Sequence, residues 1–434
     1  VFVNSLNYEL TAAQKRSLAE IRRDMESGDA MNRLLQGDVG SGKTVVAECA
    51  ILNAVSSGCQ AAFMAPTELL AAQHYETLTK DFSNLELKIV FLSSSIGAKE
   101  RRETLAILKD GDADIVVGTH AIISDKVEFN NLGLVITDEQ HRFGVNQRQA
   151  LSAKGANPDV LVMTATPIPR TLAVIFYGDL DISVIDELPP GRKPVITRKF
   201  NEGTRREAYA FMRSQVELGH QCYVVAPFIE DPRTLEGRSA EMLYLELSET
   251  YKDIKLGLMH GAMKAADKDM VMSDFAAGKI EVLVSTVVIE VGINVPNATL
   301  MIIENAERFG LAQLHQLRGR VGRGSSESYC FIVTDSESDM AEERADILCS
   351  TNDGFEIAER DLEMRGPGEL FGYRQHGIPQ LKLADPARHI NIVARAGEDA
   401  SEILSADPSL TLPENASLRQ KIEFEFATGA SIVL

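Results

Sequence analysis

Short apolar runs alternate along most of the chain with longer amphipathic stretches. In the first part of the chain we expect strands at Leu34–Leu35, Ala61–Ala65, Ile89–Leu92, Ile115–Val117, Leu134–Ile136 and Val160–Met163. The stretches between them, such as Thr67–Lys80 and Ala98–Leu108, have helical spacing. Nearly continuous apolar strands that alternate with helices are typical of parallel sheets covered on both faces.

The alternation pauses at Leu188–Pro194, where three prolines fall within six residues. Prolines at this density cannot lie inside a helix or a central strand, so we place a linker there. A second set of strands follows, at Tyr223–Ala226, Leu256–Met259, Val282–Ser285, Met301–Ile303 and Tyr329–Val333. The pattern therefore predicts an α/β fold of two tandem lobes, at residues 1–190 and 191–343, followed by a helical, highly charged region at 344–434.

Composition narrows the function classes. The 434 residues are 44% hydrophobic and 25% charged, and Lys+Arg minus Asp+Glu is 44 − 63 = −19. No run of 18 apolar residues and no signal peptide is visible, so we expect no membrane association. The five cysteines form no C-x-x-C pair, which argues against a zinc site or a disulfide framework. An acidic chain that binds DNA must use local basic patches.

A glycine-rich segment lies between the first predicted strand and a predicted helix at Val45–Val55. Its residues, Gly37-Asp38-Val39-Gly40-Ser41-Gly42-Lys43-Thr44, match G-x-x-x-x-G-K-[ST] at every fixed position. The backbone N–H groups of such a loop and the helix N-terminus bind phosphates. Lys43 would bridge the β- and γ-phosphates, and Thr44 would bind Mg²⁺. The alternative is a glycine-rich turn that matches by chance.

Two consecutive acids end the fifth predicted strand. Asp138 and Glu139 follow the apolar run Leu134–Ile136 and Thr137. In a phosphate-loop nucleotidase, a carboxylate at such a strand end holds Mg²⁺, which is the role we expect for Asp138. Glu139 would orient or deprotonate the attacking water. The simpler interpretation is that Asp138 caps a turn after a buried strand.

Three arginines fall within six residues of the second lobe, at Arg318, Arg320 and Arg323. The guanidinium fork matches the oxygens of a phosphoryl group in transfer. If this segment faces the first lobe, ATP is bound between the lobes and its hydrolysis is coupled to their closure. The alternative is a solvated basic helix, although the intervening glycines are poor helix formers.

Together these motifs resemble the superfamily 2 nucleic-acid translocases, whose lobes are RecA-like. Leu10–Gln14 resembles the adenine-reading Q motif, with Gln14 as the reader, and Gln316–Arg323 fits Q-x-x-G-R-x-x-R, which implies arginine fingers at Arg320 and Arg323. Resemblance also extends to the segments that start at Ala65, Val117, Thr164 and Ser285. It implies DNA contacts for Thr67, His120 and Thr286.

Longer stretches narrow the resemblance to the RecG family. These are Thr137–Val145, Met163–Leu172 and Arg308–Gln313. Gly354–Gly372 resembles a translocation motif of that family, a helical hairpin and loop in which Arg360, Arg365 and Gln375 would contact DNA. The alternative for the two arginines is ion pairing with neighbouring acids such as Glu356 and Glu363.

The resemblance implies an ATP- and Mg²⁺-dependent duplex-DNA translocase that remodels stalled replication forks and migrates Holliday junctions. It implies a monomeric bacterial cytoplasmic protein at the nucleoid, with DNA and a single-strand-binding protein as partners. No N-terminal wedge domain fits ahead of Gln14, so we expect the chain to be the motor portion. The alternatives are a transcription-repair coupling motor, a degenerate scaffold without turnover and a single-strand RNA helicase.

Overall fold

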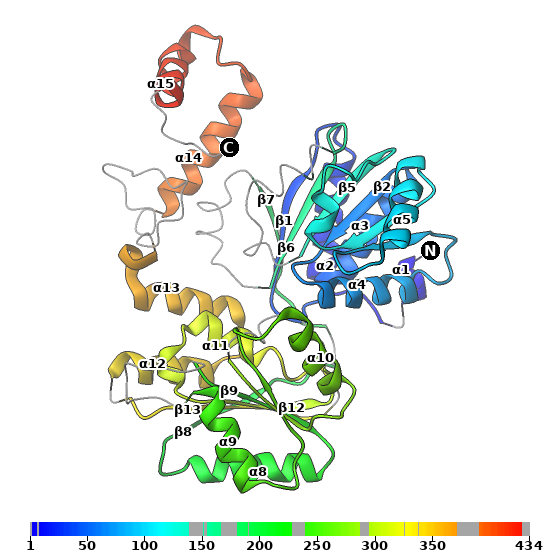
Figure 1. Cartoon of the computed structure of the whole chain (residues 1–434). Helices are drawn as coiled ribbons and strands as arrows, with labels where there is room; N and C mark the ends of the chain where they lie inside the picture. Colours follow the sequence, from blue (N-terminus) through cyan, green and yellow to red (C-terminus); the bar gives the residue numbers. More distant parts are fainter. Residues whose placement is uncertain are drawn as a thin grey trace. The chain divides into compact units, whose positions relative to one another are not determined.

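The computed structural model describes residues 2–6, 8–138, 151, 154–165, 180–189, 191–227, 239–286, 295–324, 326–336, 338–370 and 390–427. It forms two compact units (Figure 1). The first comprises Val1–Pro167 and Ser183–Ile357, and the second comprises Ile168–Ile182 and Ala358–Leu434. The domain limits at residues 190 and 343 remain a prediction.

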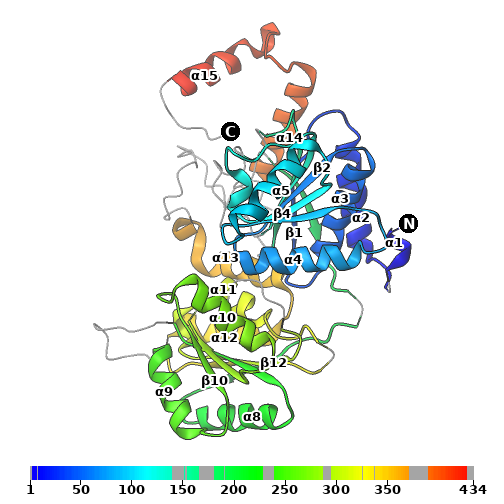
Figure 2. The ribbon, with the colours of Figure 1, turned by 45° about the vertical axis from the view of Figure 1, so that its right-hand side comes forward.

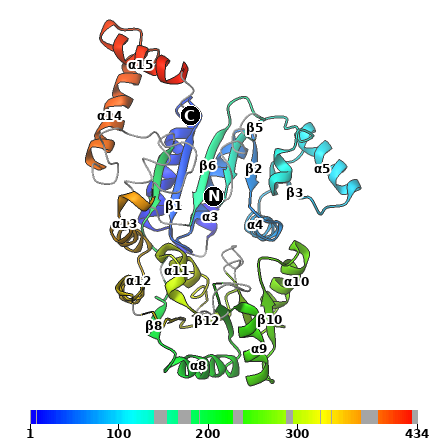
Figure 3. The same ribbon diagram turned by 60° about the vertical axis from the view of Figure 1, so that its left-hand side comes forward.

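The first sheet has the strand order β3-β4-β2-β5-β6-β1-β7 in the described residues. Figure 3 shows β1, β6, β5 and β2 side by side in this order. Its strands are β1 (Asn32–Gly37), β2 (Gln60–Met64), β3 (Ile89–Leu92), β4 (Ile115–Gly118), β5 (Leu132–Thr137), β6 (Asp159–Thr164) and β7 (Asp181–Ile185). The ladders from β3 to β1 are parallel.

The second sheet has the order β10-β11-β9-β12-β13-β8, and all its ladders are parallel. Its strands are β8 (Ile196–Phe200), β9 (Gln221–Val225), β10 (Leu256–Met259), β11 (Val282–Ser285), β12 (Ala298–Ile303) and β13 (Tyr329–Val333). The two parallel α/β sheets confirm the predicted fold class. Among the described strands, β7 and β8 were not predicted from the sequence pattern.

Helices cover the sheets, as Figures 1 and 2 show. Those of the first unit are α1 (Phe2–Ser5), α2 (Ala12–Met25), α3 (Lys43–Ser56), α4 (Glu68–Asp81), α5 (Ala98–Asp110), η1 (His120–Ile123), α8 (Arg205–Glu217), α9 (Ala240–Thr250), α10 (Ala265–Ala276), η4 (Ala306–Arg308), α11 (Leu311–Arg318) and α12 (Asp339–Ser350). Then follow α13 (Gly354–Leu370), α14 (Ile390–Ala406), η5 (Pro413–Asn415) and α15 (Ala416–Ala427). The C-terminal region is therefore helical in its described parts.

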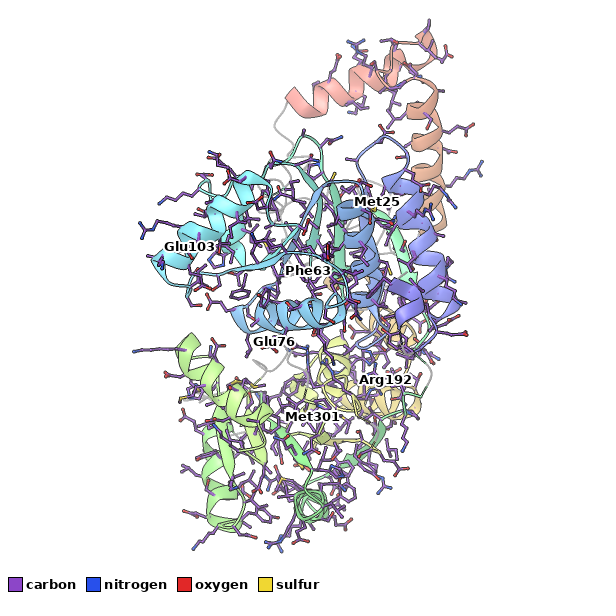
Figure 4. The ribbon with its side chains drawn as sticks, turned by 90° about the vertical axis from the view of Figure 1, so that its right-hand side faces the viewer. Met25, Phe63, Glu76, Glu103, Arg192 and Met301 are labelled. Atoms are coloured by element: carbon purple, nitrogen blue, oxygen red, sulfur yellow. The ribbon has the colours of Figure 1, made fainter. Side chains whose placement is uncertain are left out.

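The central strands are buried along their whole length because both faces of each sheet are covered. Every residue of β2, β4, β9, β11 and β12 is buried. Figure 4 shows Phe63 of β2 inside the first lobe, between helices that carry Glu76 (α4) and Glu103 (α5) on their exposed sides. This rigid frame leaves the loops after the strands as the places where polar chemistry can gather.

Candidate nucleotide site and nucleic-acid interface

The predicted site residues follow strand ends on the same edge of each sheet. The phosphate loop follows β1, Asp138 follows β5 and Thr164 ends β6. These three strands are neighbours, whereas Thr67 and His120 follow β2 and β4 on the other side of β5. The carboxyl edge of the first sheet is therefore divided between expected nucleotide residues and expected DNA residues.

The phosphate loop turns tightly into α3. Gly40 and Gly42 have φ values of +75° and +85°, a region that glycine enters at no steric cost. Lys43 is the first residue of α3, and its Nζ donates hydrogen bonds to the carbonyl oxygens of Gly37 (2.8 Å) and Asp38 (2.9 Å). The ammonium group is thus fixed against the backbone of the loop, in which Ser41 is also buried.

Gln14 braces the phosphate loop from α2. Its Oε1 accepts a hydrogen bond from the Thr11 N–H at 2.9 Å, while Thr11 Oγ1 caps the helix at the Gln14 N–H. Its Nε2 donates to the Ser41 carbonyl oxygen at 2.9 Å, and the residue is buried. The structure therefore brings Gln14 to the loop as the sequence motif predicts, and its role in reading adenine remains a prediction.

Asp138 contacts a histidine that was not among the site residues predicted from the sequence. His74 Nε2 lies 2.9 Å from Asp138 Oδ2, and the His74 ring packs on Phe63 with centroids 4.5 Å apart. His74 belongs to α4 and carries no motif, so only the tertiary structure reveals the pair. Glu139 lies outside the described residues.

A cavity of about 520 Å³ brings residues of both lobes together. Its wall contains Gly40, Gly42, Lys43, Thr44, His74 and Asp138 from the first lobe, and Arg320, Arg323 and Gly324 from the second. Arg320 is buried, and Arg323 Nε donates to the Gly319 carbonyl oxygen at 3.2 Å. The arginines therefore face the same space as the phosphate loop, as the sequence hypothesis requires.

Arg192 is a further cation in this wall, from the linker after β7. Its guanidinium donates a hydrogen bond to the Val39 carbonyl oxygen and lies against Gly40, where a Cβ atom would stand 2.0 Å from Nη1. Burial lowers the pKa of Arg192, and Asp38 partly offsets that effect. The proline-rich linker was predicted, but nothing in its spacing indicated that one of its residues reaches the phosphate loop (Figure 4).

The oxygen donors in the cavity fit Mg²⁺. Thr44 and Asp138 both line it. Within the described ranges, no cluster of three or more His, Cys, Asp or Glu side chains could hold a metal ion by itself. Mg²⁺ at nucleotide sites typically takes one or two protein oxygens and completes its shell with phosphates and water, so this sparse donor set is the expected one.

The expected DNA contacts in the lobes differ in exposure. Thr67 is the N-cap of α4 and its Oγ1 accepts from the Leu70 N–H at 3.3 Å, while His120 begins η1 and is exposed. Thr286 follows β11 and is buried, with its N–H bonded to the Met259 carbonyl oxygen at 3.1 Å. Thr286 is therefore less accessible than His120, and its DNA contact remains a prediction.

Helix α13 carries the expected arginines of the C-terminal region. Arg360 is exposed, and its Nη1 lies 3.5 Å from Glu363 Oε2. This ion pair is one of those considered in the alternative reading, and it leaves the guanidinium accessible. Arg365 belongs to the helix, but its side chain and Gln375 lie outside what the structure describes. The helix continues to Leu370.

Family models match three successive blocks of the chain. Residues 11–175 match "DEAD/DEAH box helicase", residues 205–325 match "Helicase conserved C-terminal domain", and residues 351–426 match "ATP-dependent DNA helicase RecG, domain 3, C-terminal". ATP-dependent DNA helicase RecG of Bacillus subtilis (strain 168) is 49% identical over 422 residues, which are 97% of this chain and 62% of that protein. The chain belongs to the RecG-type ATP-dependent DNA helicases.

Other RecG comparisons agree. RecG of Thermotoga maritima is 52% identical over 418 residues, covering 96% of this chain and 53% of that protein. A solved structure of RecG bound to a three-way DNA junction matches with a TM-score of 0.78 and 50% identity, over 90% of this chain and 51% of that one. The chain thus spans between half and two thirds of these relatives and matches the motor region of RecG.

More distant helicases share the fold alone. Mss116p, solved with single-stranded RNA and AMP-PNP, has a TM-score of 0.60 at 17% identity over 83% of this chain and 78% of that one.

In the described parts of this RecG-type chain, no helix combines the length and apolarity that a bilayer crossing requires.

Proposed function

We propose that the chain is an ATP-driven motor that translocates along duplex DNA and, within a longer RecG-type protein, remodels stalled forks and migrates Holliday junctions. One observation carries the proposal: Lys43, Thr44 and Asp138 line the same cavity as Arg320 and Arg323. Cations and oxygen donors from two lobes around one space are what phosphoryl transfer requires.

In this proposal the first lobe binds ATP and the second completes the site. The loop from Gly37 to Thr44 holds the triphosphate through its backbone N–H groups and Lys43. Mg²⁺ held by Thr44 and Asp138 would neutralise phosphate charge. Glu139 orients the attacking water, and Arg320 and Arg323 stabilise the charge that spreads over the γ-phosphate oxygens. Because the arginines come from the other lobe, hydrolysis is linked to lobe movement.

DNA would be held mainly through its phosphates. Thr67, His120 and Thr286 follow strands, and Arg360, Arg365 and Gln375 belong to the C-terminal region. Contacts of this type fix the position of the duplex and carry little sequence information. The overall charge of −19 repels DNA, so binding depends on these local groups and weakens steeply with salt.

The match of residues 351–426 to RecG domain 3 favours a RecG role over that of a transcription-repair coupling motor. The relatives compared above are bacterial. We propose that the protein acts as a monomer in the bacterial cytoplasm at the nucleoid, with DNA and a single-strand-binding protein as partners.

The test is steady-state ATPase of this chain without DNA, with single-stranded DNA, with linear duplex and with a model fork, at one low salt concentration. We expect strong stimulation by plain duplex and little more by the fork, since the chain matches only half to two thirds of its RecG relatives and the resemblance implies a separate wedge domain for the fork. Stimulation by single strands alone would overturn the duplex-translocase proposal. Absence of ATPase under all four conditions would favour the scaffold alternative.

A further inference from the structure

The phosphate loop is contacted by α11 at a point that the catalytic motifs do not include. His315 of α11 places Nε2 2.7 Å from Asp38 Oδ1, and both side chains are largely buried. The same Asp38 Oδ1 accepts the Val39 N–H at 2.6 Å. One carboxylate oxygen therefore joins the backbone of the phosphate loop to a helix of the second lobe.

The histidine ring is fixed from its other side. Arg318 Nη2 donates to His315 Nδ1 at 2.9 Å, and Arg318 Nη1 donates to the carbonyl oxygens of Leu348 and Thr351, both at 2.7 Å. A guanidinium can only donate, so Nδ1 accepts and Nε2 carries the proton that is donated to Asp38. Arg318 thus sets both the orientation and the tautomer of the ring.

Close packing accompanies this hydrogen bond. Gly319 follows α11 and lies so near Val39 that a Cβ atom there would stand 2.9 Å from Val39 Cβ. Burial would raise the pKa of Asp38, but the His315 hydrogen bond, the Val39 N–H and the charge of Lys43 hold it below its usual range. The loop therefore offers a charged acceptor to the helix at a dry, tightly packed contact.

The contact lies immediately before the arginines. Arg320 is one residue beyond Gly319, and Arg323 donates to the Gly319 carbonyl oxygen. We propose that the Asp38–His315 pair, with Gly319 packed on Val39, positions Arg320 and Arg323 against the ATP held by the phosphate loop. His315 is on this view a positioning residue, which acts on the transition state through the arginines. This inference rests on the proposed ATPase function.

The test compares His315→Phe, which keeps a ring but cannot donate, with His315→Gln, whose amide can still donate to Asp38. We expect His315→Phe to lower kcat about tenfold on saturating duplex DNA, with KM for ATP changed less than about twofold. His315→Gln should recover most of the rate. The matched control is His220→Phe, because His220 lies just before β9, pairs with Asn297 and does not line the cavity.

Two further variants keep the test decisive if His315→Phe does not fold. Asp38→Ala removes the acceptor from the loop side, and Gly319→Ala disturbs the packing without altering a polar group. Gly319→Ala should give the same kcat loss with KM retained, and Asp38→Ala should give at least that kcat loss, because it also removes the acceptor of the Val39 N–H. Adding His315→Phe to Asp38→Ala should lower kcat no further, because the Asp38–His315 contact is already absent.

A binding measurement separates this inference from the proposed function. Affinity for ADP with aluminium fluoride, a mimic of the transferring phosphoryl group, should fall about tenfold in His315→Phe, while affinity for ADP stays unchanged. Unaltered kcat and unaltered mimic binding in a folded His315→Phe would overturn the positioning role alone. An equal loss for ADP would make the pair a nucleotide-binding device and also overturn it. A parent chain that neither binds nor hydrolyses ATP would overturn the proposed function and this inference with it.

Discussion

The phosphate loop and helix α13 both carry cations expected to meet phosphate, yet they hold them in opposite ways. Lys43 is 9% exposed and donates to two backbone carbonyl oxygens. The Arg360 side chain is 57% exposed and has Glu363 at 3.5 Å. A reacting phosphate requires donors fixed before it arrives, because reorganisation during the reaction reduces catalysis.

A motor that moves along DNA needs the opposite property, namely cations that are not fixed in one position. Successive phosphates must be bound and released, so a long, mobile arginine on an exposed helix face suits the task. The comparison predicts that changes at the buried cations and acids alter turnover or folding strongly. Changes on α13 should instead alter movement on DNA while leaving the fold intact.

The largest effect is expected for Lys43→Ala. Removing the ammonium group should lower ATPase by at least about 100-fold, because Lys43 supplies a fixed positive charge for the β- and γ-phosphates. Circular dichroism and thermal unfolding should stay close to those of the parent. Retained ATPase in this variant would remove the phosphate-loop assignment.

A buried acid of the second lobe should govern folding. Glu304 Oε1 accepts from Arg205 Nε at 2.7 Å and from the Tyr209 hydroxyl at 2.6 Å, and Glu304 is 2% exposed. Glu304→Ala leaves the buried Arg205 guanidinium with the more exposed Glu246 and removes the acceptor of the Tyr209 hydroxyl, so we expect a loss of about 3 kcal/mol in unfolding free energy. Urea unfolding measures it, with exposed Glu343→Ala as a control that should stay within about 0.5 kcal/mol.

Glu48 should make the first lobe sensitive to alkaline pH. Burial and the neighbouring Asp81 raise the pKa of Glu48 from 4.5 to about 8. The folded state holds this proton more tightly than the unfolded state, so stability is fully present below pH 4.5 and is lost as pH rises towards 8. Glu48→Gln keeps the group neutral and should therefore raise the melting temperature above that of the parent at pH 9.

The same substitution should have little effect on melting at pH 5, where the parent side chain is protonated. The expected difference at pH 9 is on the order of a few kcal/mol. Glu76→Gln is the matched control, because Glu76 is exposed on α4. Equal responses of the two variants at pH 9 would mean that general surface charge, and not the buried carboxyl, causes the alkaline loss.

The smallest effect on stability is expected on α13. Arg360→Ala removes an exposed i,i+3 pair and should change unfolding free energy by no more than about 0.5 kcal/mol. ATPase should be retained, whereas displacement of a third strand from a triplex, which reports translocation, should be lost. The salt dependence of duplex binding should weaken by about one phosphate contact.

Glu363→Ala serves as the partner control, since it removes the ion pair but keeps the arginine. We expect it to leave translocation unchanged. If Glu363→Ala and Arg360→Ala fail equally, the pair braces the helix and the DNA role of Arg360 is wrong.

Sequence reasoning located what local pattern determines. The inner strands, such as β2 and β12, were recognised because apolar side chains fill both faces. Strand β8 was not predicted, because it is an edge strand whose side chains are mostly solvent-accessible and lack a continuous apolar run. The phosphate loop was found because its glycines and lysine occupy fixed positions within eight consecutive residues.

Partners distant in the chain could not be found in this way. His74 and Asp138 are 64 residues apart, and Asp38 and His315 are 277 apart, so their pairing exists only after the sheets have formed. His315 does stand beside the recognised arginine motif, and its position was the one available signal. No comparable signal in the sequence indicated Arg192, because a basic residue in a proline-rich linker usually faces solvent.

The strand order of the first sheet has a consequence for synthesis on the ribosome. Strand β1 is bordered by β6 and β7, which begin at Asp159 and Asp181, while β1 itself ends at Gly37. At about 5–20 residues per second, β1 waits roughly 7 to 30 s after its own translation before both neighbours have been made. During that interval its backbone donors and acceptors are open to incorrect pairing. The loop proposed to bind ATP is therefore translated well before its strand gains both of its neighbours, and it obtains its finished support only when β7 has been made.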